Sequence, residues 1–178
     1  MKLIVRILAL SACAVALAAC SPSMNEAAVD PRAVAAVRLD PQAAIAQLNA
    51  YRASKGLGPV RLDSSLDAMA LHQAYAMAAS GQLSHTVGGA FTSRLAADRI
   101  DAGEAGENLG AGYYSLEQAM AGWKGSSEHN ANMLRPGFTR IGVAIAKNAR
   151  TSWGVYWSME FAGEPAPKRE AGLVSAGG

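Results

Sequence analysis

The stretch "RIGVAIAKNARTSWGVYWSMEFA", residues 140–162, decides the fold of this 178-residue chain. Large side chains alternate with small or polar ones on both sides of the polar segment "KNART". The large positions are Ile141, Val143 and Ile145 before that segment, and Trp153, Val155, Trp157, Met159 and Phe161 after it. A period of two residues is typical of a strand with two different faces. We therefore expect an antiparallel hairpin with Trp153 and Trp157 in the core.

Helical patterns precede this hairpin. Asp40 and Pro41 form an N-cap and a first-turn proline, and the helix they open ends before Gly56. Asp63 opens a second helix, which Gly81 ends. Residues 91–101 predict a shorter helix with Thr92 as a cap, and the capping box that begins at Ser115 opens a helix to about Trp123. A third strand is expected at "GENLGAG", residues 106–112. Helices followed by strands indicate an α+β domain with helices over the sheet.

The first twenty residues have the composition of a secretory signal peptide. Lys2 and Arg6 give a basic start, and residues 7–19 form an apolar run that is short for a membrane-spanning helix. The run ends in "LAAC", which resembles the lipobox of bacterial lipoproteins. By that resemblance the chain is cleaved before Cys20, and Cys20 carries the lipid. The alternative is an ordinary signal peptide that is cleaved near Ala19.

The rest of the composition narrows the function classes. The only cysteines are Cys13 and Cys20, so the expected mature body has no disulfide. Without Lys2 and Arg6, 14 basic residues balance 14 acidic ones, and this charge gives no reason to expect a nucleic-acid partner. We predict four segments: a signal peptide at 1–19, a flexible lipid-anchored tether at 20–40, a folded domain at 41–163 and a disordered tail at 164–178.

Three polar residues are candidates for a site: His85, Glu107 and His129. They are far apart in sequence, so no local metal-binding spacing links them. Each also has an ordinary interpretation. His85 can be a capping or solvated residue, Glu107 can hold the N–H groups of a glycine turn, and His129 can cap its own helix. His72 lies within the second helix, where we expect a structural role.

The sequence motifs around these residues resemble those of the CAP superfamily. This superfamily comprises cysteine-rich secretory proteins, antigen 5 and pathogenesis-related 1 proteins, and its domains are also called SCP domains. The resemblance covers residues 42–162 and follows the family's order of motifs. The matching segments are "LNAYRASKGLGPVRLD", "SHT", "GENLGAGYY", "SSEHNANMLRPGFTRIGVAIA" and "WGVYWSMEFAG". The match is closest to the bacterial branch, which lacks the disulfides of the eukaryotic members.

The resemblance implies an α-β-α sandwich with a three-stranded antiparallel sheet, about four flanking helices and a central cleft. The family places two His and two Glu in that cleft, and His85, Glu107 and His129 match three of these positions. The fourth position is Ser126 in this sequence. Glu128 is near it but does not match, and it can replace the missing acid only if it points inward.

These residues allow three functions. The first is a ligand cleft formed by His85, Glu107, Ser126, Glu128 and His129, for which Tyr113 and Tyr114 suit a lipid or a glycan. The second is a metal-dependent hydrolase, since His85 and His129 can bind Zn²⁺ and a zinc-bound water can act as nucleophile. The third is a scaffold in which the polar residues form an architectural network. The expected location is the cell envelope, at the outer membrane because Ser21 rather than Asp follows Cys20.

Overall fold

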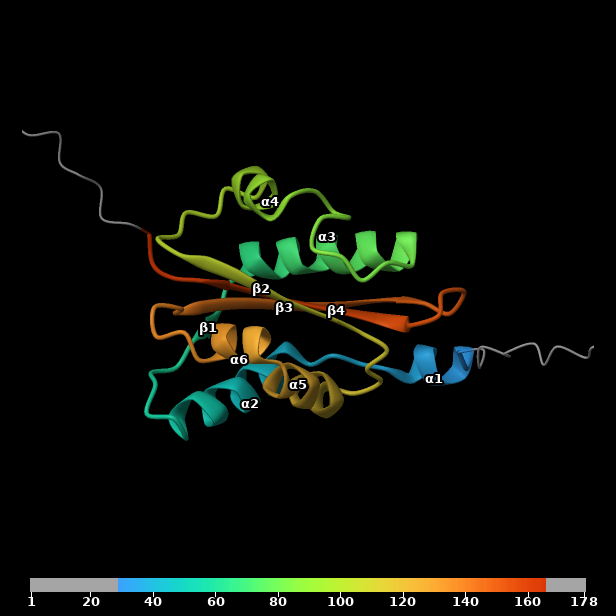
Figure 1. Cartoon of the computed structure of the whole chain (residues 1–178), viewed down its shortest axis with the longest axis horizontal. Helices are drawn as coiled ribbons and strands as arrows, with labels where there is room; N and C mark the ends of the chain where they lie inside the picture. Colours follow the sequence, from blue (N-terminus) through green and yellow to red (C-terminus); the bar gives the residue numbers. More distant parts are fainter. Residues whose placement is uncertain (1–28, 166–178) are drawn as a thin grey trace, which may run out of the picture.

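The computed structural model describes residues 29–165 and shows a sheet between two layers of helices (Figure 1). The sheet has the order β1-β3-β4-β2. Its strands are β1 (Arg61–Leu62), β2 (Ala105–Ala111), β3 (Arg140–Asn148) and β4 (Gly154–Ala162). β4 pairs antiparallel with both β2 and β3, whereas β1 adds two residues parallel to β3. The predicted hairpin and third strand are therefore confirmed, and β1 is an additional short strand.

Within residues 29–165, six helices surround this sheet. They are α1 (Pro31–Ala36), α2 (Pro41–Ala53), α3 (Ser64–Ser80), α4 (Phe91–Ala97), α5 (Leu116–Gly125) and α6 (Ser127–Met133). Figure 1 shows α3 and α4 on one face of the sheet and α2, α5 and α6 on the other. This arrangement is the α-β-α sandwich that the resemblance implied.

Both faces of β4 are buried, because each layer of helices packs on one of them. The large side chains Trp157, Met159 and Phe161 belong to the main core cluster with α2 and α5. The opposite face carries Tyr156, which packs with α3. Gly142 of β3 lets α3 approach very closely, since a Cβ at this position would collide with the backbone nitrogen of Asp67. The small residues of the hairpin therefore make room for a helix rather than face solvent.

Local signals for the helix ends were accurate. Asp40 and Asp63 accept hydrogen bonds from first-turn N–H groups of α2 and α3, and Ser115 does the same for α5. Gly81 ends α3 in the left-handed conformation with φ of 72°. Thr92 was wrong as a cap, because α4 begins one residue earlier and its N-cap position, Ala90, makes no side-chain hydrogen bond.

The ordered body extends further toward the N-terminus than residue 41. Residues 29–40, which fall within the predicted tether, contain α1, and Val34 and Val37 are buried in the main core cluster. Burial of these two side chains explains why this segment packs against the body. The signal peptide, Cys20 and almost all of the predicted tail lie outside the described residues. No helix within residues 29–165 has the length and hydropathy needed to cross a membrane.

Candidate functional site

The first site residue, His85, lies in the loop that follows α3. Buried Gln73 of α3 holds this loop by donating a hydrogen bond from Nε2 to the carbonyl of Ser84 at 2.6 Å. Arg94 of α4 donates from Nη2 to the carbonyl of His85 itself at 3.2 Å. The His85 side chain remains 60% exposed. The loop is thus fixed at its backbone while the imidazole ring is accessible.

Glu107 lies on β2 and is buried beneath that ring. Its Oε1 is 2.7 Å from His85 Nδ1, and its Oε2 accepts a hydrogen bond from Arg94 Nη2 at 2.7 Å. An ionised carboxylate only accepts hydrogen bonds, so in this contact the His85 proton is on Nδ1 and Nε2 is the free nitrogen. Glu107 therefore orients the ring of His85 and does not hold the N–H groups of a glycine turn.

A second buried acid, Glu160, completes this network from β4. Glu160 is the cross-strand neighbour of Glu107, and Arg94 Nη1 lies 3.2 Å from its Oε1. Ser158 donates to the same oxygen at 2.9 Å, whereas the buried Oε2 has no hydrogen-bond partner. Burial raises the pKa of Glu160 well above its ordinary value, the charge and proximity of Glu107 add to this, and Arg94 and Ser158 act against it. These surroundings favour the protonated form of Glu160.

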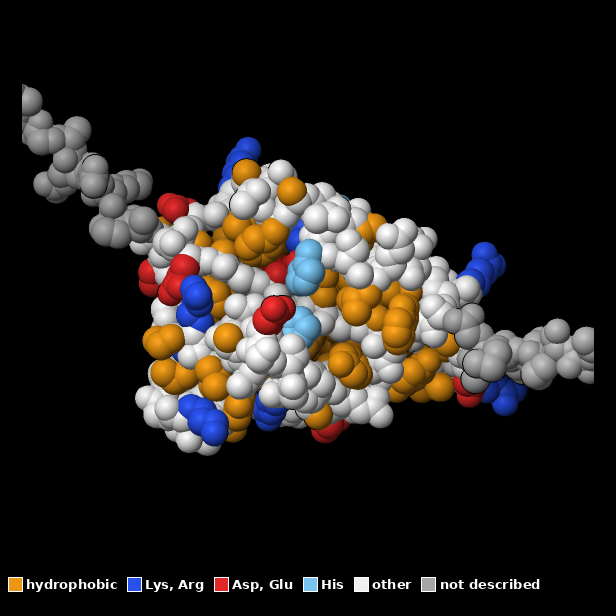
Figure 2. Space-filling view, viewed as in Figure 1, with side chains coloured by type: hydrophobic (Ala, Val, Ile, Leu, Met, Phe, Trp, Pro, Cys, Tyr) orange, Lys and Arg blue, Asp and Glu red, His pale blue; other side chains and the backbone are white. Residues whose placement is uncertain are grey.

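His129 reaches the same region from α6. Its backbone carbonyl accepts a hydrogen bond from Asn108 Nδ2 at 2.9 Å, which ties α6 to the residue next to Glu107. Burial lowers the pKa of His129, and its proximity to His85 lowers it further, while Glu128 opposes the change. Figure 2 shows two histidine side chains close together near the middle of one face. The structure thus brings His85, Glu107 and His129 into one region, with His129 neutral at neutral pH.

The other predicted cleft residues lie nearby but are not buried with Glu107. Ser126 is half-buried at the N-cap position of α6 and makes no capping hydrogen bond. Glu128 is exposed in the first turn of α6, so it does not take the place of a second buried acid. That acid comes instead from Glu160, at a different position of the chain.

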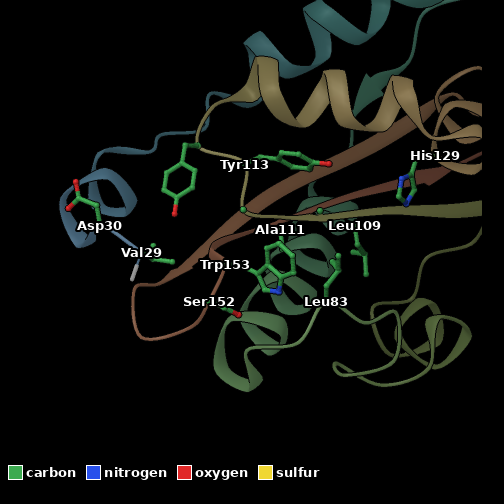
Figure 3. A pocket seen from close by; sticks show the side chains of 12 residues that line it. Val29, Asp30, Leu83, Leu109, Ala111, Tyr113, His129, Ser152 and Trp153 are labelled. Atoms are coloured by element: carbon green, nitrogen blue, oxygen red, sulfur yellow. The ribbon is translucent and has the colours of Figure 1, made fainter. Parts of the chain in front are cut away.

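A groove of about 740 Å³ extends from His129 along the end of β2 (Figure 3). Its lining includes Leu109–Gly112, Tyr113, Tyr114, Leu83 and Trp153, and Asp30 lies at the end far from His129. The expectation that Trp153 lies in the core was wrong, because its side chain is 45% exposed. The strand begins only after Trp153, and a tight turn centred on Gly154, with φ of 71°, breaks the alternation there. Trp157 is fully buried, as expected.

Sequence reasoning missed Arg94 and Glu160. Glu160 had a recognisable signal, because a charged residue inside an apolar strand needs a buried partner. Arg94 had none, since an arginine in a short amphipathic helix is ordinary and its partners lie 13 and 66 residues away.

The donors at this site do not make a complete zinc site. His85 and His129 supply two imidazoles, but both oxygens of Glu107 are already engaged by His85 and Arg94. Across residues 29–165, no group of three His, Cys, Asp or Glu side chains is placed to hold a metal ion. A zinc ion there would have two protein ligands rather than the three typical of catalytic zinc.

Comparison with known proteins identifies the family of this chain. Residues 45–161 match the CAP family, described as the cysteine-rich secretory protein family. This chain belongs to the CAP family. YkwD of Bacillus subtilis strain 168 is 30% identical over 119 residues, which cover 65% of this chain and 44% of that protein. The CAP chain therefore spans less than half the length of this curated relative.

Solved structures show the same fold. An extracellular protein containing an SCP domain from Bacillus anthracis aligns with a TM-score of 0.63 and 23% identity, over 69% of this CAP chain and 40% of that chain. An outer surface protein of Borrelia burgdorferi aligns with a TM-score of 0.62 and 18% identity, over 71% and 96% of the two chains. At these identities the alignments establish the fold alone.

Proposed function

We propose that this CAP protein is a lipid-anchored component of the bacterial cell envelope that binds a ligand at His129 and along the adjoining groove. The lipobox around Cys20 supports the anchor and the envelope location, and the similar solved proteins named above are described as extracellular or outer-surface proteins. The outer membrane is the proposed site because Ser21 follows Cys20.

The observation that carries the binding function is the position of His129 in the lining of an aromatic groove. A neutral imidazole can both donate and accept a hydrogen bond, and Tyr113 and Trp153 offer apolar faces with polar edges. Such a lining suits a ligand that has an apolar surface and at least one polar group, which includes the lipid or glycan ligands expected from the sequence.

Tryptophan fluorescence gives a direct test, because Trp153 is exposed whereas Trp123 and Trp157 are fully buried. We expect palmitate or chitotetraose, titrated separately, to shift the emission to the blue as Trp153 is covered. The dissociation constant should rise about tenfold in His129→Ala, the loss of one hydrogen bond. His72→Ala is the control, since His72 is exposed on α3 and outside the groove lining. Equal affinities of the two variants would contradict a role for His129.

The runner-up function is metal-dependent hydrolysis, and one contact favours it. A metal-binding histidine commonly donates a hydrogen bond from its other ring N–H to a carboxylate. Glu107 Oε1 accepts such a hydrogen bond from His85 Nδ1. Equilibrium dialysis with Zn²⁺ tests the idea. Binding of zinc that is lost in both His85→Ala and His129→Ala, but kept in His72→Ala, would support it. Zinc binding that is unchanged in these variants would exclude this site.

The architectural alternative accounts for only part of the network. Arg94, Glu107 and Glu160 are buried and tie α4 to β2 and β4. The ring of His85, in contrast, is largely exposed, and His129 is half-buried. We infer that the acids and Arg94 hold the site together and that the two imidazoles meet the ligand.

A further inference from the structure

The two ends of the sheet carry different arrangements of charge. At the end where β4 finishes, basic side chains pair with acids: Arg61 with Glu164, Arg135 with Glu104 and Arg140 with Asp63. The other end contains the start of the described chain and the turn between β3 and β4 (Figure 1). Residues 29–38 and 147–154 lie there, and we call the surface that they form the end face. It contains four basic residues and one acid, namely Arg32, Arg38, Lys147, Arg150 and Asp30.

The two segments of the end face pack against each other. A Cβ at Gly154 would lie 2.6 Å from a methyl carbon of Val29, so the start of the described chain lies directly on the start of β4. Lys147 Nζ donates to the carbonyl of Val37 at 2.8 Å, and Arg38 Nη1 donates to the same carbonyl at 2.9 Å. Two positive charges therefore meet at one carbonyl oxygen, where a nearby anion would reduce their repulsion.

The basic side chains of the end face have no acidic partner. All four are exposed, and none forms an ion pair with a carboxylate of residues 29–165. Asp30, the acid of this face, caps α1 by accepting a hydrogen bond from the backbone N–H of Arg32 at 2.9 Å. The excess positive charge of the end face therefore meets solvent, where it attracts anions.

Exposed apolar side chains lie beside these cations. Trp153 is 45% exposed and Leu83 is 48% exposed, and both line the groove together with Val29. Figure 3 shows Trp153 and Leu83 on the same side of β2, and Figure 2 shows hydrophobic and basic side chains together at this end of the molecule. Trp153 follows Arg150 by three residues in the turn between β3 and β4. A tryptophan next to basic residues is typical of the interface between a membrane and water.

We propose that the end face rests on an anionic phospholipid surface, with Trp153 and Leu83 among the headgroups and the basic side chains on the phosphates. A phospholipid surface offers phosphate anions and an apolar layer side by side, which matches the two kinds of side chain at this end. The inference rests on the proposed lipid anchor, because Val29 is nine residue steps from Cys20. It goes beyond that anchor, since it assigns the surface of the folded body that contacts the membrane.

The contact between the end face and the membrane is expected to be weak without an acyl chain. Each basic residue near an anionic membrane strengthens binding by roughly fivefold. Lasting attachment to a bilayer generally needs more than one signal, such as a basic surface together with an acyl chain. The end face therefore orients the tethered protein, so that the groove lies beside the membrane, and does not replace the anchor.

The test uses the mature chain from residue 20 without acylation, so that the end face is measured apart from the anchor. The probe is a vesicle of phosphatidylethanolamine and phosphatidylglycerol that also contains phosphatidylcholine brominated in its acyl chains. We expect the bromine to quench Trp153 and the emission to shift to the blue, because Trp123 and Trp157 are fully buried. Trp153→Phe should abolish the quenching. Vesicles of phosphatidylcholine with the same quencher should bind far more weakly, and added salt should release the protein.

Single substitutions locate the contact on the end face. Arg32→Gln and Arg150→Gln should each raise the half-saturating lipid concentration by roughly fivefold. Lys55→Gln is the matched control, since Lys55 is exposed just after α2, at the opposite end of the molecule (Figure 1). Leu83→Ala should weaken binding about threefold. Leu71→Ala should have little effect, because Leu71 is exposed to a similar degree, 41%, but lies near the middle of α3.

Several results would overturn this proposal. Equal binding to anionic and neutral vesicles, or binding that salt does not change, would show that the basic side chains do not contact the membrane. Quenching that palmitate abolishes would place a lipid in the groove instead and leave the ligand-binding function intact. Failure of the vesicles to bind, while Cys20→Ala still leaves the membranes of the cell, would remove the end face and keep the anchor. Vesicle binding by a protein that carries no lipid on Cys20 in the cell would keep the end face and remove the anchor.

Discussion

Two carboxyl groups, Glu107 and Glu160, share a single buried cation, Arg94. Burial raises the pKa of Glu160, and this favours its protonated form beside the single buried cation. Glu107 contacts the same guanidinium and orients His85. Glu160 thus influences the charge balance of the site through Arg94, which also contacts Glu107.

Replacing this buried acid should change how stability depends on pH. The folded state raises the pKa of Glu160, so its contribution is most favourable below the ordinary pKa of a glutamate and declines as pH rises toward the raised value. Glu160→Gln cannot ionise, so its unfolding free energy should gain on that of the wild type as the pH rises above the ordinary pKa of a glutamate, about 4.3. Urea unfolding at several pH values measures this. Parallel pH profiles of wild type and variant would contradict it, and Glu128→Gln, which changes an exposed carboxyl, is the control.

The site was only partly predictable from individual residues. His85, Glu107 and His129 were found because they match the motifs of a family, whereas Arg94 and Glu160 depend on contacts between distant segments. Alternation placed Trp157 correctly in the core and failed for Trp153, because Trp153 lies before β4 and a turn is centred on Gly154, the first residue of that strand. Periodicity predicts a face only where the backbone stays regular.

At the scale of the elements, Arg52 connects α2 with the segment between α6 and β3. Its guanidinium donates to the carbonyls of Met133, Arg135 and Phe138 at 3.0, 3.0 and 3.2 Å, and its Nε donates to the carbonyl of Gly58 at 2.8 Å. The side chain is 1% exposed, so these carbonyls have little access to water. Arg52 thereby fixes the end of the helix that carries His129.

Arg52→Met should therefore be strongly destabilising. It keeps most of the apolar stem but leaves several buried carbonyls without donors, a loss of about 3 kcal/mol or more in the free energy of unfolding. Chemical denaturation measures the loss directly. Lys55→Met, which alters an exposed residue near the end of the same helix, should change stability by no more than about 0.5 kcal/mol. A similar small effect for Arg52→Met would refute its role as a connection.

The helices whose ends were predicted correctly have strong capping signals in the local sequence. The caps of α2, α3 and α5 depend on side chains next to the helix they start, so the sequence alone identified them. In contrast, β1 has two residues and exists only because it pairs with β3. The six-residue α1 is too short to be stable alone and depends on the burial of Val34 and Val37. Tertiary contacts decide both elements, and local sequence does not encode them.

On the scale of the whole molecule, the proposed anchor lies close to the groove along the chain. Val29 lines the groove, and nine residue steps separate it from Cys20. A chain of that length spans about 30 Å at full extension. If Cys20 carries the lipid, the groove therefore stays near the membrane surface, where it meets ligands of the envelope.

Cys20→Ala tests this attachment. We expect the variant to leave the membrane fraction and to lose its partitioning into detergent, because acyl chains supply the proposed attachment. Cys13→Ala is the matched control and should stay with the membranes, since Cys13 lies within the predicted signal peptide. Recovery of Cys20→Ala with the membranes would contradict lipidation at this position.

The covered margins of the sheet also limit how this protein can self-associate. A fibril built by strand pairing grows only if every subunit has two exposed sheet edges, one for each neighbouring subunit. Here Asp67 and Lys147 cover one side, and on the other side Trp123 and Asn132 donate hydrogen bonds to the carbonyls of Leu109 and Glu107 on β2. Within the described residues, both sides of the sheet are therefore partly covered against pairing with a second copy.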